Sequence, residues 1–108
     1  MTRLTTHVLD VSAGTPAQGM RVELHDASAT SPCRLAETRT NADGRCDRPL
    51  LEGEALRRGR YALTFHVGEY FRARGVVLPD PAFLDEVVVQ FGVADPARPY
   101  HVPLIVSP

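Results

Sequence analysis

The chain has 108 residues, of which 44% are apolar, and a formal net charge of −1. This length suffices for one domain with a single core and leaves no room for a second domain. The near-neutral charge supplies no long-range field for nucleic acid or an anionic membrane. No apolar run reaches the ~18 residues of a membrane span, and residues 1–7 lack the apolar core of a signal peptide. We therefore expect a cytoplasmic protein with no nucleic-acid or membrane partner.

The first half of the chain alternates polar and apolar residues with the period of two that half-buried strands require. Its expected strands cover residues 3–11, 20–27 and 33–40. The third has only a weak apolar signal at Leu35, which favours an edge or an exposed face. A turn is expected at 29–32, and the Asp43-Gly44 pair readily supplies the positive φ of a tight turn. Residues 48–51 then form a short strand or extended segment.

The second half contains three further alternating segments, at residues 60–67, 86–93 and 99–107. The last of them places four apolar residues on one face, namely Tyr100, Val102, Leu104 and Val106. That face should point into the core, so His101 points out of the sheet, and Pro103 indicates an edge or a bulge. Residues 70–74 are expected to form one or two helical turns before Gly75 stops them. About seven short strands with at most one short helix indicate a β-sandwich.

Two cysteines, Cys33 and Cys46, flank the Asp43-Gly44 turn. If this turn closes a hairpin, the two thiols lie far out of register across it. Their Cα atoms are then further apart than the roughly 7 Å that a disulfide allows, so we expect free, buried or half-buried thiols. No Cys-x-x-Cys or His-x-x-x-His spacing suggests a metal site.

Histidine has the unperturbed pKa nearest neutral pH, so it can give or take a proton there. His25 and His66 fall on the polar faces of alternating strands and are expected at the surface. His7 and His101 lie within strands at opposite ends of the chain, where packing residues are commoner than catalysts. Arg45 is either a solvated turn residue or a guanidinium that binds a planar, carbonyl-rich or anionic substrate. These residue types permit an active site of His7, Arg45 and His101 without requiring it.

Three separated motifs of the chain are Thr6-His7-Val8-Leu9-Asp10 with Gly14-Thr15-Pro16-Ala17, then Thr40-Asn41-Ala42-Asp43-Gly44-Arg45, and finally Tyr100-His101-Val102-Pro103-Leu104. In content and order they resemble the motifs of the 5-hydroxyisourate hydrolases, the transthyretin-like proteins of purine breakdown. The likeness extends through residues 86–91 and Asp95-Pro96, so it covers essentially the whole chain.

This resemblance implies an all-β fold for residues 1–108, a single transthyretin-like domain. It would be an antiparallel β-sandwich of two four-stranded sheets with one short helix after the fifth strand. The resemblance also implies a homotetramer, a dimer of dimers with active sites in clefts at the dimer–dimer contact. The implied reaction is hydrolysis of 5-hydroxyisourate to 2-oxo-4-hydroxy-4-carboxy-5-ureidoimidazoline, with no cofactor.

Carried over residue by residue, the family's catalytic and substrate-binding positions match His7, Arg45 and His101. One imidazole would act as general base for attack of water on a ring carbonyl. Arg45 would hold the substrate and offset the developing oxyanion. The other histidine would orient the water or protonate the leaving ring nitrogen, and the resemblance does not assign the two histidine roles.

The chain departs from the family at its end. Members normally continue past the Ser-Pro of the last strand into one more strand ending Tyr-Arg-Gly-Ser, which supplies an active-site serine and much of the pairing between subunits. Without it, residues 99–107 form an unpaired edge. Three explanations compete: the sequence holds only the ordered residues, which we favour; the chain is truncated; or the native protein is short and weakly active. Pro99 also replaces a histidine often found two residues before His101.

Two other functions compete with the enzyme. One is a non-catalytic small-molecule carrier, as vertebrate transthyretin is, and the other is a structural or adhesive β-sandwich module. The carrier relative lacks the set of two histidines and one arginine, and an adhesive module has no reason to place them at the family's positions. Retention of His7, Arg45 and His101 therefore favours the hydrolase.

Overall fold

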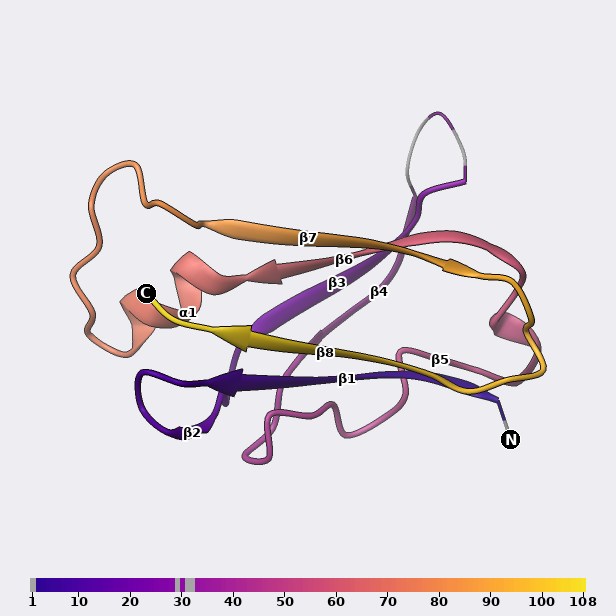
Figure 1. The fold of residues 1–108 in the computed structure, drawn as a ribbon, viewed down its shortest axis with the longest axis horizontal. Helices are drawn as coiled ribbons and strands as arrows, with labels where there is room; N and C mark the ends of the chain where they lie inside the picture. The colour runs from indigo at the N-terminus through magenta and orange to yellow at the C-terminus, as the bar shows by residue number, and fades with distance from the viewer. Residues whose placement is uncertain (1, 29, 31–32) are drawn as a thin grey trace.

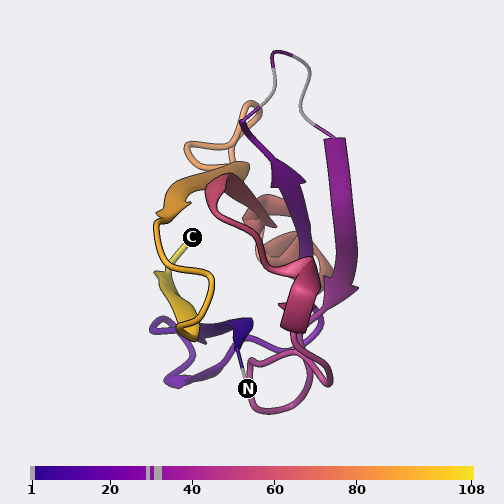
Figure 2. The same cartoon turned by 90° about the vertical axis from the view of Figure 1, so that its right-hand side faces the viewer.

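The computed structural model describes residues 2–28, 30 and 33–108, so the turn expected at 29–32 lies outside the described residues except for Thr30. Two four-stranded sheets form separate layers (Figures 1 and 2). The first sheet contains β1 (Arg3–Asp10), β2 (Thr15–Pro16), β5 (Leu51–Glu52) and β8 (Tyr100–Val106). The second contains β3 (Arg21–Asp26), β4 (Cys33–Arg39), β6 (Gly59–His66) and β7 (Glu86–Val93). A 3-10 turn, η1 (Gly53–Ala55), and one α-helix, α1 (Val67–Ala73), complete the fold.

The second sheet has the order β4-β3-β6-β7, with every neighbouring pair antiparallel. The expected edge position of β4 is confirmed, which explains the weak apolar signal around Leu35, an exposed residue. Strand β7 forms the other edge, and its side chains alternate between exposed and partly buried as its sequence predicts. Strand β6 lies in the middle of this sheet and carries the most buried side chains.

The first sheet is mixed, so the expectation of wholly antiparallel sheets is wrong for one pair of strands. Strand β8 runs parallel to β1, in a register from Leu4 opposite Tyr100 to Asp10 opposite Val106. The two short strands β2 and β5 pair antiparallel with β1 on its other side. Among the described strands β8 pairs only with β1, which confirms that Pro103 lies in an edge strand. This pairing places the first and last long strands of the chain side by side, with the two termini at opposite ends of the sheet (Figure 1).

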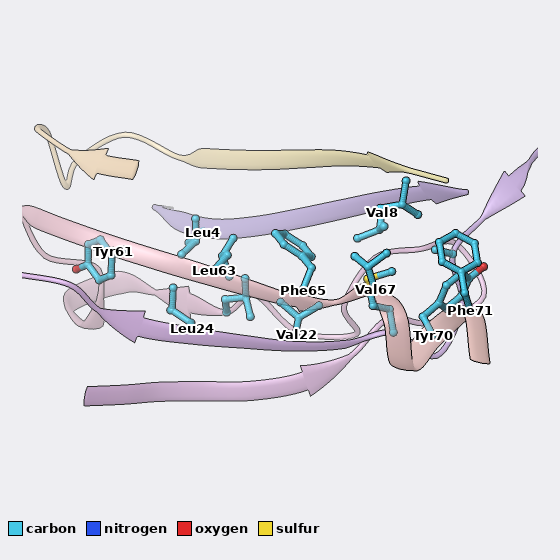
Figure 3. Packing of buried hydrophobic residues seen from close by; sticks show 14 of the residues in the cluster. Leu4, Val8, Val22, Leu24, Tyr61, Leu63, Phe65, Val67, Tyr70 and Phe71 are labelled. Atoms are coloured by element: carbon cyan, nitrogen blue, oxygen red, sulfur yellow. The ribbon is translucent and has the colours of Figure 1, made fainter. Parts of the chain in front are cut away.

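The core lies between the two sheets and is built from the inward faces that the alternation predicts (Figure 3). Leu4 and Val8 of β1 point toward Leu63 and Phe65 of β6, and all four are fully buried. Burial of each such side chain stabilises the fold by about 1.5–3 kcal/mol. On β8 the expected inward residues are partly or fully buried, whereas His101 is exposed. The polar side chains on the outer face of β1 and β8 are therefore available for contact with a ligand.

Helix α1 begins three residues earlier than expected, at Val67, because its first turn is buried against the core. Gly75, with φ of 85°, ends it as predicted, and Val76 N donates a hydrogen bond to Phe71 O at 3.0 Å. Tyr70 Oη donates to Asp10 Oδ2 at 2.8 Å, which ties the helix to β1. No helix among the described residues is both long and apolar enough to cross a membrane.

Burial alone would raise the pKa of Asp10, but hydrogen bonds from Ser12, Tyr70 and Ala13 outweigh it and hold this pKa below its ordinary value. Burial and the Asp10 carboxylate raise the pKa of Tyr70 to about 12. The pair is therefore an ionised carboxylate and a neutral phenol at neutral pH. It anchors the end of β1 to α1.

The expectation that His66 is a surface residue is wrong, because its side chain is 7% exposed. His66 Nε2 lies 3.0 Å from Glu23 Oε2, and its Nδ1 lies 3.3 Å from Arg21 Nη2 and 3.5 Å from Glu86 Oε1. The hydrogen bond from His66 is the main reason that the pKa of Glu23 is lowered. His66 thus belongs to a charge network on the second sheet. His25 is half-buried.

Candidate active site

The outer face of the first sheet brings His7 and His101 together. Thr5 and His7 point outward from β1 because Leu4, Thr6 and Val8 point into the core. The parallel register sets His101 directly beside Thr5. The ring centroids of the two histidines are 6.4 Å apart, with their planes inclined by 42°. One substrate-sized group can contact both rings.

Arg45 reaches the same face through the Asp43-Gly44 turn. This turn does not close a hairpin with β4. It carries the chain across to the other sheet, where the backbone of Arg45 forms an isolated antiparallel β-bridge with that of His7. Val8 N donates to Gly44 O at 2.8 Å, and this docking fixes the crossing. Gly44 has φ of 74° and lies so close to β1 that a Cβ would collide with Val8 O. Glycine is required here by both conformation and space.

Asn41 holds the turn from inside. Its Oδ1 accepts hydrogen bonds from Asp43 N at 2.9 Å and from Arg45 N at 3.2 Å. Its own backbone N donates to Arg45 O at 2.6 Å, and Gly44 N donates to Asn41 O at 2.9 Å. Its side-chain amide also donates to Asp47 Oδ1 at 3.0 Å. Both backbone polar groups of Arg45 are therefore fixed by one asparagine.

His101 has a fixed partner on the neighbouring strand. Its Nδ1 lies 2.8 Å from Thr5 Oγ1, which orients the ring and leaves Nε2 for other groups. Although His101 is partly exposed, burial of the rest of its ring lowers its pKa. The positive charges of Arg45 and His7 lower this pKa further, by smaller amounts. The neutral form of His101, which can accept a proton, therefore persists to lower pH than in a free histidine.

A cavity of about 220 Å³ adjoins the histidine pair. Its lining residues come from the start of β1 and from the chain after the turn: Arg3, Thr5, Thr6, Arg45, Cys46 and Arg48. Of these, only Arg45 was expected from the sequence as a site residue. Thr5 could have been found because it shares a strand face with His7. Arg3 lies on the same face of β1 and could have been found in the same way. Arg48 could not, because nothing local shows that it approaches Arg3.

Both cysteines are free, as expected, but Cys33 is exposed and only Cys46 is half-buried. Burial and the nearby Asp47 charge raise the pKa of the Cys46 thiol, so it is a poor nucleophile at neutral pH. Within the described ranges no group of three or more His, Cys, Asp or Glu residues could hold a metal ion. The chemistry that the site itself offers is proton transfer by imidazole near the positive charge of Arg45, which acts on His101.

Solved structures share this fold. Klebsiella pneumoniae 5-hydroxyisourate hydrolase is 31% identical with a TM-score of 0.81, over 100% of this chain and 91% of that one. Transthyretin from Sparus aurata is 21% identical with a TM-score of 0.87, over 100% of this chain and 90% of that one. The expected transthyretin-like sandwich with one short helix is confirmed.

Sequence comparison agrees with the structural one. A protein of Ralstonia nicotianae named 5-hydroxyisourate hydrolase is 57% identical over 108 residues, which are 100% of this chain and 92% of that protein. The profile of the family described as HIUase/Transthyretin matches residues 4–108. The chain therefore belongs to the HIUase/Transthyretin family.

Proposed function

We propose that this chain hydrolyses 5-hydroxyisourate in urate degradation, giving 2-oxo-4-hydroxy-4-carboxy-5-ureidoimidazoline. The observation that carries the proposal is the meeting of His7, Arg45 and His101, from three separate parts of the sequence, with the two imidazoles 6.4 Å apart. The full-length relative at 57% identity, named for this activity, supports it. The reaction as proposed uses water, two imidazoles and one guanidinium, without a cofactor.

We assign the general base to His101. Its lowered pKa favours the neutral ring near pH 7, and when Nδ1–H donates to Thr5 Oγ1 the lone pair of Nε2 is free. Nε2 takes a proton from water as the oxygen attacks a ring carbonyl, and Arg45 donates to the oxyanion that develops. His7 protonates the ring nitrogen as the carbon–nitrogen bond breaks, which leaves a carboxylic acid that ionises. Such acid–base help is typically worth ~10²–10⁴ in rate.

The test generates 5-hydroxyisourate in situ with urate oxidase and follows its decay. The wild-type chain should accelerate the decay well above the spontaneous rate, and His101→Asn should lose most of that acceleration because asparagine cannot carry the proton. His25→Asn is the matched control, since His25 lies on the other sheet. A wild-type protein with no acceleration contradicts the hydrolase and favours a carrier of small molecules.

We further propose a homotetramer in which the outer faces of the first sheet oppose each other. Leu9 and Ile105 expose apolar side chains on the same face as the two histidines, 37% and 65% exposed respectively. A second copy would cover them and close the open side of the site. Light scattering should give four times the 11.8 kDa chain mass. Ile105→Arg should dissociate the assembly and lower activity.

Strands β1 and β8, from the two ends of the sequence, pair in one sheet. This pairing supports the proposal of a single domain over residues 1–108. A cytoplasmic location stays a prediction of the sequence.

A further inference from the structure

Three arginines line the cavity beside the histidine pair. Arg3 enters from the start of β1, Arg45 from the turn, and Arg48 from the segment after it. All three side chains belong to exposed residues. No ion pair within 4 Å joins any of them to a carboxylate among the described residues, whereas Arg21 and Arg34 on the second sheet each have acidic partners.

Two acidic residues lie near this cavity, but neither lines it. Glu52 lies opposite Arg3 in the strand register. Asp47 accepts a hydrogen bond from the amide of Asn41, and its charge reaches Cys46. The other lining groups are two threonines and the neutral thiol of Cys46. The lining therefore contains three arginines and no carboxylate, and a small space with this charge balance attracts anions.

One hydroxyl of the cavity is occupied as a donor, because Thr6 Oγ1 donates to Val102 O at 2.7 Å. Thr5 Oγ1 accepts from Nδ1–H of His101 in the tautomer assigned above, so its own hydroxyl proton stays available beside the arginine N–H groups. The arginines supply the charged donors, and guanidinium forks match carboxylates and acidic imides with paired donors. At about 220 Å³ the cavity is below the ~300–1,000 Å³ of drug-sized pockets, so it suits a single carboxylate or one small ring.

The cavity is continuous with the catalytic trio. Thr5 lines it and holds His101, and Arg45 lines it and lies opposite His7 in a backbone β-bridge. A planar ligand placed between the imidazoles can therefore extend one edge toward Arg3 and Arg48.

We propose that Arg3 and Arg48 form, with Arg45, an anion subsite that binds the acidic edge of the ring substrate and the carboxylate formed when the ring opens. This inference rests on the proposed hydrolase function. Hydrolysis breaks one carbon–nitrogen bond and converts a neutral ring carbonyl into a carboxylate. The negative charge of this carboxylate then lies beside the three arginines. Arg3 and Arg48 are then specificity-determining residues that act on substrate and product binding, while the imidazoles move the protons.

The first test is kinetic. Arg3→Gln and Arg48→Gln should each raise KM for 5-hydroxyisourate about tenfold, because each removes charge-assisted hydrogen bonds, and should leave kcat within about twofold. Arg3→Lys and Arg48→Lys should restore part of the loss. Arg58→Gln, which removes an exposed arginine from another part of the surface, is the matched control and should not change KM.

The second test needs no enzyme activity, because Cys46 lines the same cavity. In a Cys33→Ser background, Cys46 is labelled at one pH with anionic sulfonatoethyl or cationic trimethylammonioethyl methanethiosulfonate. Relative to the same ratio of rates for a small free thiol in solution, the anionic reagent should be favoured over the cationic one about tenfold at Cys46. Arg3→Gln and Arg48→Gln should lower this ratio of rates, whereas Arg58→Gln should not. The ratio cancels any change in the thiol pKa.

The outcomes separate the subsite from the function. A wild-type protein without hydrolase activity whose labelling ratio still falls in Arg3→Gln and Arg48→Gln keeps the anion subsite and refutes the proposed function. An active wild type whose KM and labelling ratio are unchanged in both variants refutes the subsite. A ratio that falls while KM stays unchanged refutes the role of these arginines in substrate binding.

Discussion

Gly44 offers a sharp test of how the turn delivers Arg45. A Cβ at this position would collide with Val8 O and would lie 3.1 Å from Pro16 Cβ and 3.3 Å from Ala17 N. Ordinary contact begins at 3.4 Å, so the turn must retreat by on the order of 1 Å. The positive φ adds about 1–2 kcal/mol of strain, and overpacking adds about 1–3 kcal/mol. Gly44→Ala should therefore lower the free energy of unfolding by about 2–5 kcal/mol.

The same retreat moves Arg45 away from the histidine pair. A displacement of this size can reduce a rate about 100-fold, so kcat/KM for 5-hydroxyisourate should fall by about that factor in Gly44→Ala. Gly14→Ala is the matched control, because Gly14 has φ of 68° but no atom within 4 Å of a built Cβ. It should lose only the strain energy and keep its activity. Equal losses in the two variants, measured by urea unfolding and decay assays, would refute the role of the docked turn.

Three further results are expected from the hydrogen bonds and pKa shifts. Thr5→Val should lower kcat about tenfold with little change in KM, because His101 loses the partner on Nδ1, and Thr5→Ser should restore it. In the pH profile of kcat/KM for the wild type, the midpoint of the acid limb should lie below pH 6.5, because the lowered pKa of His101 keeps its ring neutral to lower pH. A midpoint above pH 6.5 would contradict the assignment of His101 as the base. Tyr70→Phe should cost about 1.5–3 kcal/mol in urea unfolding at pH 7. This cost should shrink below pH 3.8, as the lowered pKa of Asp10 is reached and its ionised form is lost, whereas Tyr100→Phe should cost little at either pH.

Local sequence patterns predicted most of the second sheet and the inward faces of the strands. Alternation gave the orientation of His7 and His101 because a strand's side chains have a strict period of two. Gly75 marked the end of the helix because its positive φ leaves the helical conformation at little cost. These features depend on residues close together in the chain.

The missed features depend on contacts between distant segments. Nothing in either strand shows that β8 runs parallel to β1, because the two are joined through the whole domain. The Asp43-Gly44 turn looks like a hairpin, but the docking of Gly44 on Val8 sends it to the other sheet. The alternation along β6 places His66 on the polar face of the strand, where a surface residue is expected. The side chains of Glu23 and Arg21 on the neighbouring strand contact it there, and it is buried. Arg48 can be assigned to the cavity only once it is known that the chain crosses to the first sheet at this turn.

The central claim is that His7 and His101 work as one proton-transfer unit beside Arg45. A double-mutant cycle tests it most directly, with kcat/KM for 5-hydroxyisourate measured for His7→Asn, His101→Asn and the double variant, each shown to be folded by circular dichroism. Residues that act as a unit are strongly non-additive, so each single variant should lose ~10²–10⁴ and the double variant little more. Losses that simply multiply, or a single variant that keeps the wild-type rate, would contradict the account.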